Sequence, residues 1–431
     1  MRHIFETIAC ITCAALMSSA SSIHAAANEA VLALAKKEQP ALIDTLKQLT
    51  AIESGSRERA ELDKIADVLA NRLRDLGGKV EMIEPTEADT VRLSDTPEKI
   101  GKMVKATFTG TGTKKILLIA HMDTVYPKGM AAGQPFKIDG DKVYGLGIAD
   151  ARGGLATILH TLAMLKAMNF RDYGTLTVFF NADEEIGSPG ARLHHQRLGA
   201  EHDATMSFEG GGSPTEDRVR LATSGHALAH LTVRGRASHA GAAPERGVNA
   251  LEELSFQILQ MRDLSDAKTG VKVNWTLSRA GIVYNMIPPG AQATADVRVA
   301  RIADYDGIEA RLKERVKKKL LPDSSVELVF ERRFPPLEPK PTSRALANHA
   351  ASVYAELGKK LNVVDDAQGG FTDAANASLK TKAPVVEGFG LRGFGSHTTN
   401  AEYILMSSIE PRLYLATRMI MDISNGKAPL Q

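Results

Sequence analysis

The sequence has very little cysteine and almost no net charge. Its two cysteines, Cys10 and Cys13, both lie near the N-terminus, so the rest of the 431 residues can form no disulfide and offers no thiolate. The 53 Lys and Arg residues against 51 Asp and Glu leave a formal charge of +2, too small to attract nucleic acid or an anionic membrane. No apolar run is long enough to cross a bilayer. We therefore expect a globular protein that recognises its partners at local sites, with neither nucleic acid nor a membrane among them.

The N-terminal segment has the pattern of a secretory signal peptide. A short polar start is followed by an apolar run over 8–17 and by three alanines at 25–27, which supply a small-residue cleavage site. A buried N-terminal helix is the alternative, but such a helix rarely ends in this cleavage pattern. We expect residues 1–27 to be a signal peptide and the protein to be exported, either to the periplasm or out of the cell.

Predicted strands and helices alternate in the first half of the mature chain. The sequence predicts buried strands over 115–120 and 176–181, a helix between them over 153–168, and a shorter strand over 204–208. Such alternation is typical of an α/β fold in which a mixed sheet lies between layers of helices.

The pattern changes after a glycine-rich loop at 210–214. The next residues predict a strand over 220–233, a helix over 249–264, strands over 271–279 and 291–299, a helix over 303–319 and a strand over 325–330. This β-α-β-β-α-β order is typical of a ferredoxin-like unit. We expect an inserted α+β domain at 219–334 within a larger, discontinuous α/β domain at 28–218 and 335–431.

Metal-ligand residue types follow several predicted strands of the larger domain. They are His121, Asp123, Asp183, Glu184, Glu185, Glu209 and His397, and Asp150 stands just before a predicted helix. Because the carboxyl ends of strands in an open α/β sheet form its ligand crevice, these side chains can converge. Taken singly, each is more often a surface or loop residue than part of a site. Together they suit two zinc ions that share one carboxylate, with an unligated carboxylate as general base.

Five ordered motifs resemble the aminoacylase/carboxypeptidase family of co-catalytic zinc peptidases. They are HMD at 121–123, GIADARGG at 147–154, DEEIGS at 183–188, SFE at 207–209 and GFGSH at 393–397. Within that family the chain especially resembles the bacterial glutamate carboxypeptidases of the carboxypeptidase G type. The resemblance covers essentially the whole mature chain.

The resemblance implies two Zn²⁺ ions per subunit, with Co²⁺ or Mn²⁺ as substitutes. It implies that Asp150 is the bridging ligand, that His121 and Glu209 complete one ion's ligands, and that Glu185 and His397 complete the other's. Glu184 would be the general base. Asp123 would orient His121 through its second ring nitrogen, as metal-bound imidazoles require. Ala151 and Arg152 depart from the residues found in many relatives, but neither is implied to be a direct ligand.

The resemblance extends to the inserted domain. The segment RASHAG at 236–241 resembles a family signature whose histidine, here His239, stabilises the oxyanion of the tetrahedral intermediate. His226 and His230 fit ordinary strand positions. Because this domain commonly forms a two-fold dimer in the family, we expect a homodimer in which His239 acts on the partner's site.

Four residues are implied to bind the substrate. Asn285 and Arg298 lie in segments that resemble those binding the substrate carboxylate, and Gly370 lies in a glycine-rich segment near the site. Arg218 matches a position where glutamate carboxypeptidases place a cation for the side-chain carboxylate, although a solvated hinge arginine is the alternative.

The resemblance favours hydrolysis of the amide bond to a C-terminal acidic residue, with glutamate in folate-type or N-acyl-glutamate compounds as the expected substrate. Two alternatives stay open. A deacylase of N-acyl amino acids, of the acetylornithine deacetylase or aminoacylase type, would share the metal centre. A catalytically silent periplasmic binding protein would have no use for the unligated Glu184.

Overall fold

The computed structural model describes residues 26–398 and 401–431. All but the last two residues of the expected signal peptide therefore lie outside the described residues. In the part of the chain that is described, no helix is long and apolar enough to span a membrane.

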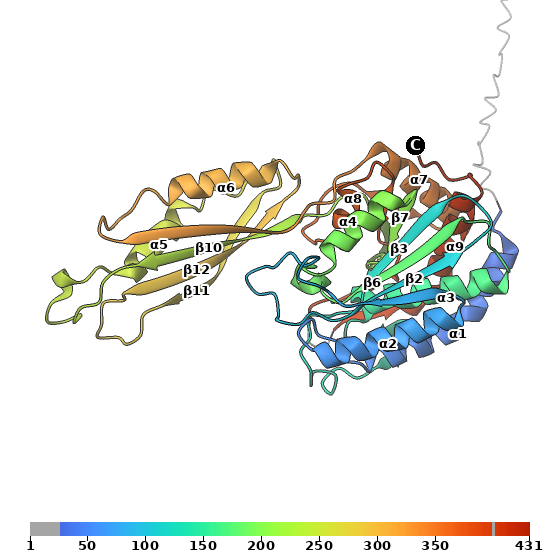
Figure 1. Ribbon diagram of the computed structural model, residues 1–431, viewed down its shortest axis with the longest axis horizontal. Helices are drawn as coiled ribbons and strands as arrows, with labels where there is room; N and C mark the ends of the chain where they lie inside the picture. Colours follow the sequence, from blue (N-terminus) through green and yellow to red (C-terminus); the bar gives the residue numbers. More distant parts are fainter. Residues whose placement is uncertain (1–25, 399–400) are drawn as a thin grey trace, which may run out of the picture.

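A large mixed sheet forms the centre of the main body, which we define as the described residues outside 225–334 (Figure 1). Its strands run in the order β1 (Lys79–Ile83), β2 (Met103–Thr109), β6 (Thr175–Asn181), β3 (Lys115–His121), β7 (Ala204–Ser207), β15 (Val385–Glu387), β9 (Glu216–Arg220) and β14 (Leu361–Val364), with β8 (Gly212–Ser213) paired to β9. Strands β6, β3, β7 and β15 are parallel neighbours, whereas β1 and β2 are antiparallel. The predicted mixed sheet is confirmed.

Helices cover both faces of this sheet. One layer contains α1 (Glu29–Thr50), α2 (Arg59–Asp75), α3 (Gly153–Ala167), α7 (Pro341–Ala355) and α9 (Ile409–Ser424), and the other contains α4 (Arg192–Glu201) and α8 (Asp373–Ser378). Residues 116–120 of strand β3 are all apolar because both faces of the strand are buried. Ile116 and Leu118 pack in the first layer, and Leu117 and Ile119 pack in the second.

A smaller sheet lies beside the first and has the order β16 (Gly393–Phe394), β17 (Tyr403–Leu405), β5 (Lys142–Tyr144) and β4 (Lys137–Asp139). It brings the segment after residue 144 next to the C-terminal strands β16 and β17. Sequence patterns did not predict this sheet, because strands of two or three residues carry too little periodicity to be recognised.

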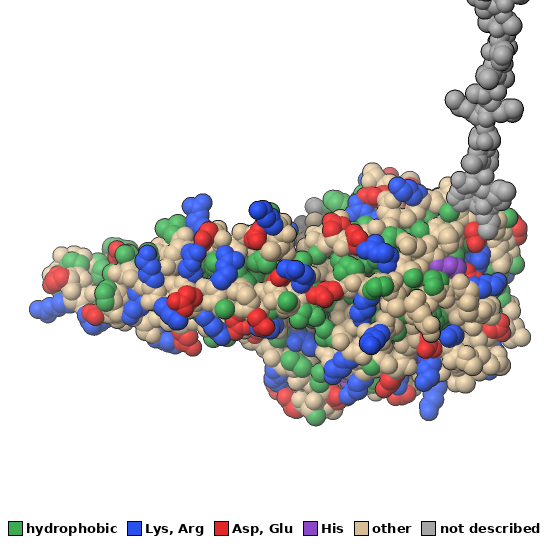
Figure 2. Space-filling view, turned by 90° about the horizontal axis from the view of Figure 1, so that it is seen from above, with side chains coloured by type: hydrophobic (Ala, Val, Ile, Leu, Met, Phe, Trp, Pro, Cys, Tyr) green, Lys and Arg blue, Asp and Glu red, His purple; other side chains and the backbone are tan. Residues whose placement is uncertain are grey.

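The chain between Gly225 and Phe334 forms an arm that projects from the main body (Figure 1). Its elements follow the chain order β10 (Gly225–Arg234), α5 (Ala250–Gln260), β11 (Lys272–Ala280), β12 (Gly290–Val299), α6 (Asp304–Arg315) and β13 (Ser325–Phe334). The sheet is antiparallel with the order β11-β12-β10-β13. The expected β-α-β-β-α-β order is therefore confirmed. Lys, Arg, Asp and Glu side chains are interspersed along the face of the arm in Figure 2.

The connection into the arm differs from its prediction. The single strand expected over 220–233 is two strands, because β9 stays in the large sheet up to Arg220 and β10 begins only at Gly225. Between them, the backbone N–H groups of Leu221 and Ser224 donate to Val364 and Gly370 of the main body. Arg220 is consequently a residue of the main body.

Candidate metal centre and adjoining cavity

Three parallel strands end beside one another and place four of the expected site residues. His121 is the last residue of β3, Glu184 and Glu185 lie in a single helical turn after β6, and Glu209 follows β7 by two residues. Because β6, β3 and β7 are parallel neighbours, their carboxyl ends lie at one edge of the sheet. The residues converge for the reason that the sequence suggested.

The carboxylate of Asp150 lies between two histidines. Its Oδ1 is 3.0 Å from Nε2 of His121, and that nitrogen is 3.2 Å from Oε1 of Glu209. Its Oδ2 is 3.4 Å from Nε2 of His397, and that nitrogen is 3.2 Å from Oε2 of Glu185. Each oxygen of Asp150 therefore faces a separate pair made of one imidazole and one carboxylate.

The backbone around Asp150 is fixed by residues on either side. The buried carboxylate of Glu402 accepts the N–H groups of Gly147 at 2.8 Å, Ala149 at 2.9 Å and Asp150 at 3.2 Å. The buried Arg152 side chain donates to backbone oxygens, including that of Leu146. The peptide bond after Asp150 is cis. Glu402 was not identified from the sequence, because no motif distinguishes it from other glutamates.

Asp123 orients His121 and the turn that follows β6. Nδ1 of His121 is 3.1 Å from the backbone oxygen of Asp123 and 3.3 Å from its Oδ1. The same carboxylate accepts the N–H groups of Glu184 and Glu185, both at 3.1 Å, and the hydroxyl of Ser56 at 2.7 Å. Since Nδ1 is held in this way, Nε2 points toward Asp150.

The crowding of buried carboxylates makes this cluster suitable for a cation. Burial, with the charge of Asp150 adding, raises the pKa of Glu185 to about 7. Burial also raises the pKa of Glu209 to about 8, although His121 opposes the shift. Oε1 of Glu185 is buried without a hydrogen-bond partner among the described residues.

The ligand atoms fit metal binding in their spacing and chemistry. One atom each from His121, Asp150 and Glu185 lie within 4.8 Å of one another. Imidazole nitrogens and carboxylate oxygens are ligands that zinc prefers. Glu209 and His397 extend this group on opposite sides of Asp150. The cluster can therefore hold positive ions that offset its buried negative charge.

Two of the expected residues lie at the end of the arm remote from the main body. Gly225, at the start of β10, pairs with Val299, whereas Arg234, at its end, pairs with Gly290. The loops that contain His239 and Asn285 follow these remote strand ends and contact each other through the N–H of Ala240 and the oxygen of Asn285 (Figure 1). Within one chain, the structure does not bring His239 or Asn285 to the metal cluster.

Arg298 lies at the other end of the arm, where it meets the main body. Its Nε and Nη2 donate to Asp296, both at 2.9 Å, and its Nη1 donates to the oxygen of Gly369 at 3.1 Å. The guanidinium stands 5.2 Å from the ring centre of Phe371, which also stacks against His226.

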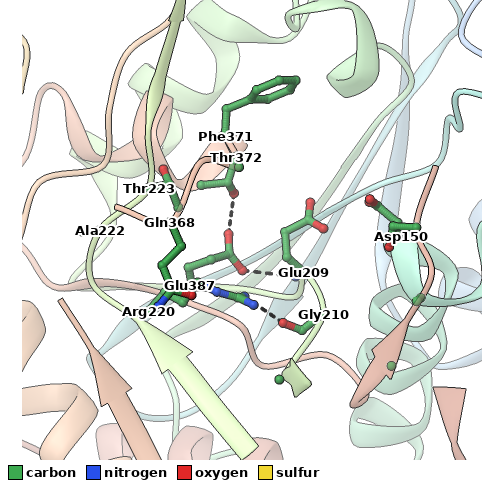
Figure 3. A pocket seen from close by; sticks show the side chains of 15 residues that line it. Asp150, Glu209, Gly210, Arg220, Ala222, Thr223, Gln368, Phe371, Thr372 and Glu387 are labelled. Atoms are coloured by element: carbon green, nitrogen blue, oxygen red, sulfur yellow. Dashed lines mark hydrogen bonds between the residues drawn. The ribbon is translucent and has the colours of Figure 1, made fainter. Parts of the chain in front are cut away.

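A cavity of about 350 Å³ adjoins the cluster. Asp150 and Glu209 line one side of it, whereas Arg220, Phe371 and Glu387 line the rest (Figure 3). The expected residue Gly370 is among its lining residues, and Arg218 is not. Arg218 instead donates to Glu216 and Gln368. No sequence signal singles out Arg220, because Arg218 and Arg220 share one face of β9 and differ only in their contacts.

Several known proteins are similar to this chain. The sequence model of the family described as Peptidase family M20/M25/M40 matches residues 117–422 of this chain. Carboxypeptidase G2 of Pseudomonas sp. (strain RS-16) is 43% identical over 393 residues, which are 91% of this chain and 92% of that protein. Acetylornithine deacetylase of Erwinia tasmaniensis is 31% identical over 236 residues, which are 53% of this chain and 57% of that protein.

Solved structures share the fold. Aminopeptidase PepT from Bacillus cereus has a TM-score of 0.71 at 23% identity, covering 89% of this chain and 98% of that chain. An M20 family metallo-carboxypeptidase from Sulfolobus solfataricus has a TM-score of 0.71 at 14% identity, covering 90% of this chain and 99% of that chain. At these identities the likeness concerns the fold alone.

Proposed function

Because the chain belongs to peptidase family M20/M25/M40 and is a metallopeptidase, we propose that it is a carboxypeptidase that hydrolyses the amide bond to a C-terminal glutamate. The observation that carries this proposal is the near-full-length likeness to carboxypeptidase G2. The likeness to acetylornithine deacetylase is confined to about half of each chain, so a deacylase is the second candidate.

The proposed centre contains two Zn²⁺ ions, with Co²⁺ or Mn²⁺ as substitutes. Asp150 would contribute one oxygen to each ion, His121 and Glu209 would complete one ligand set, and Glu185 and His397 would complete the other. Each oxygen of Asp150 faces a different imidazole, and this arrangement supports the assignment. When bound, such ions polarise a scissile carbonyl and lower the pKa of a bound water.

Glu184 is the proposed general base. Its backbone is fixed through Asp123, its side chain is buried, and it stands beside the ligand Glu185 without joining either histidine pair. It would remove a proton from the attacking water and deliver that proton to the amine nitrogen as the C–N bond breaks. A buried carboxylate can perform both steps because no bulk water competes for the proton.

The position of the arm loops supports a homodimer with shared sites. His239 and Asn285 lie together at the remote end of the arm, away from the metal cluster of their own chain. The arm also exposes large apolar side chains, including Leu277 at 68% and Tyr284 at 98% of their surface. In the proposed dimer, the partner's His239 stabilises the oxyanion.

The α-carboxylate of the substrate would be bound from two directions. Arg298 contacts Gly369 and the ring of Phe371, which lines the cavity, and the partner's Asn285 would arrive with the partner's His239. Gly370 lines the cavity and would offer its backbone. We further propose that residues 1–27 are a signal peptide and that the enzyme acts in the periplasm or outside the cell.

Steady-state assays separate the candidate functions. Purified protein loaded with Zn²⁺ should hydrolyse N-acyl-glutamate with a higher kcat/KM than N²-acetylornithine. A preference for N²-acetylornithine would instead support the deacylase. Tight binding of both compounds with hydrolysis of neither would indicate the binding protein and refute the carboxypeptidase.

A further inference from the structure

Arg220 is the one positively charged side chain among the described residues that line the cavity. It is the last residue of β9, and it stands across the cavity from Asp150, with Glu209 between them (Figure 3). Every other charged side chain in that lining is a carboxylate: Asp150, Glu209 and Glu387. The cavity therefore has a metal-ligand side and a cationic side.

The guanidinium of Arg220 forms no salt bridge among the described residues, although the charges of Glu387 and Glu209 act on it from nearby. Its Nη1 donates a hydrogen bond to the backbone oxygen of Gly210 at 2.8 Å. No carboxylate of residues 26–398 or 401–431 forms a salt bridge with it, whereas Arg218, Arg392 and Arg412 around the same strand all have carboxylate partners. A largely buried cation that forms no direct salt bridge is costly, and a bound anion would lower that cost.

Glu387 lies beside Arg220 but is occupied by other donors. Its oxygens accept the N–H groups of Glu209, at 3.1 Å, and Gly388, and the hydroxyl of Thr372. These contacts hold the carboxylate between Thr372 and Glu209 in the lining of the cavity (Figure 3). The donors of Arg220 that do not reach Gly210 are therefore left for a ligand.

We propose that Arg220 binds the side-chain carboxylate of the substrate's C-terminal acidic residue and so determines the preference for that residue. This inference rests on the proposed function. The scissile amide must lie at the Asp150 side, and the α-carboxylate is attached to the same carbon as its nitrogen. The side-chain carboxylate of glutamate lies two methylene groups farther away, so it reaches the opposite side of the cavity, where Arg220 stands.

The geometry points to Arg220 where sequence resemblance pointed to Arg218. Both residues are on β9, two positions apart, and their side chains leave the strand on the same face. Arg218 is paired with Glu216 and bonded to Gln368, and it does not line the cavity. A planar guanidinium in the position of Arg220 can bind a carboxylate through two parallel hydrogen bonds.

The test compares N-acyl-glutamate with N-acyl-glutamine, which have nearly the same shape and differ in side-chain charge. We would measure kcat/KM for both on the wild type, Arg220→Gln, Arg220→Lys and Arg218→Gln. Arg344→Gln is the matched control, because Arg344 is an exposed arginine paired with Asp365. Arg220→Gln should lower kcat/KM for N-acyl-glutamate by about 10- to 150-fold, which corresponds to the loss of a charged hydrogen bond. The value of kcat/KM for N-acyl-glutamine should change little.

Three results would overturn the inference. An equal loss on both substrates in Arg220→Gln would mean that Arg220 binds the α-carboxylate or only supports the fold. A glutamate preference that survives in Arg220→Gln, or is lost only in Arg218→Gln, would leave the proposed function intact and remove this role. A wild type without any glutamate preference would refute the acidic-substrate function and this inference with it. If Arg220→Gln does not fold, Arg220→Lys tests the inference instead. A lysine ammonium cannot form two parallel hydrogen bonds, so kcat/KM should still fall selectively for N-acyl-glutamate.

Discussion

Oδ1 of Asp150 lies 3.0 Å from Nε2 of His121, while the other oxygen of the same carboxylate faces a second imidazole at 3.4 Å. A single carboxylate in this position can serve two ions at once. Each ion would otherwise keep only one histidine and one carboxylate, which is too few protein ligands for tight zinc binding.

Asp150→Ala should therefore remove both metal ions, whereas His121→Ala or His397→Ala should weaken mainly one. Elemental analysis and native mass spectrometry would give the number of ions per chain, expected to be two in the wild type. Asp139→Ala is a control, because Asp139 is exposed and paired with the exposed Lys137. One tightly bound ion in the wild type, or one retained in Asp150→Ala, would contradict the bridging assignment.

Glu184→Gln should keep the metal content and the fold but lower kcat by about 10²- to 10⁴-fold, because the amide cannot accept the proton of the attacking water. The same substitution at Glu314, which is exposed on α6 and paired with Lys317, serves as a control. The measurements are kcat, metal content and melting temperature. Near-normal turnover with both metals present would show that another group is the base.

Much of this site could be predicted because it depends on local patterns. The run ILLIA at 116–120 is apolar at every position because β3 packs on both faces, and His121 and Asp123 stand where that run ends. A buried strand that ends in ligand residues is a local signal, and parallel strands automatically bring such ends together. Five motifs in the right order then made the arrangement specific.

The residues that sequence patterns missed act through contacts between distant segments. Glu402 supports Asp150 from 252 residues away, through backbone N–H groups that no motif marks. The sequence predicts a single strand over 220–233, whereas in the structure Arg220 ends β9 and the connection at 221–224 separates it from β10. Which of two neighbouring arginines meets the cavity depends on the partners Glu216 and Gln368, and these are visible only in three dimensions.

Glu402→Gln should weaken metal binding without removing a ligand. One of its two side-chain groups would become a donor that faces the N–H groups now donating to the carboxylate, at Gly147, Ala149 and Asp150. By analogy with other residues that orient ligands, the affinity should fall by about 10- to 100-fold. Chelator competition would measure it, with Glu356→Gln, away from the cluster, as the control. Unchanged affinity would show that the Asp150 segment holds its shape without Glu402.

The sharing of sites between subunits can be tested by mixing two inactive variants. His239→Ala lacks the oxyanion donor and Glu184→Gln lacks the base, so each homodimer should have little activity. In a mixed dimer, the subunit that carries His239→Ala keeps its own Glu184 and receives the partner's His239, which rebuilds one complete site. Random exchange makes half of the dimers mixed, and one of their two sites is complete, so activity should recover to about a quarter of the wild-type value.

The measurement is turnover of N-acyl-glutamate after the two variants are co-expressed or unfolded and refolded together. If His239 acted on its own chain, neither type of subunit would hold both groups and mixing would restore nothing, and an active monomer in light scattering would contradict the shared site equally.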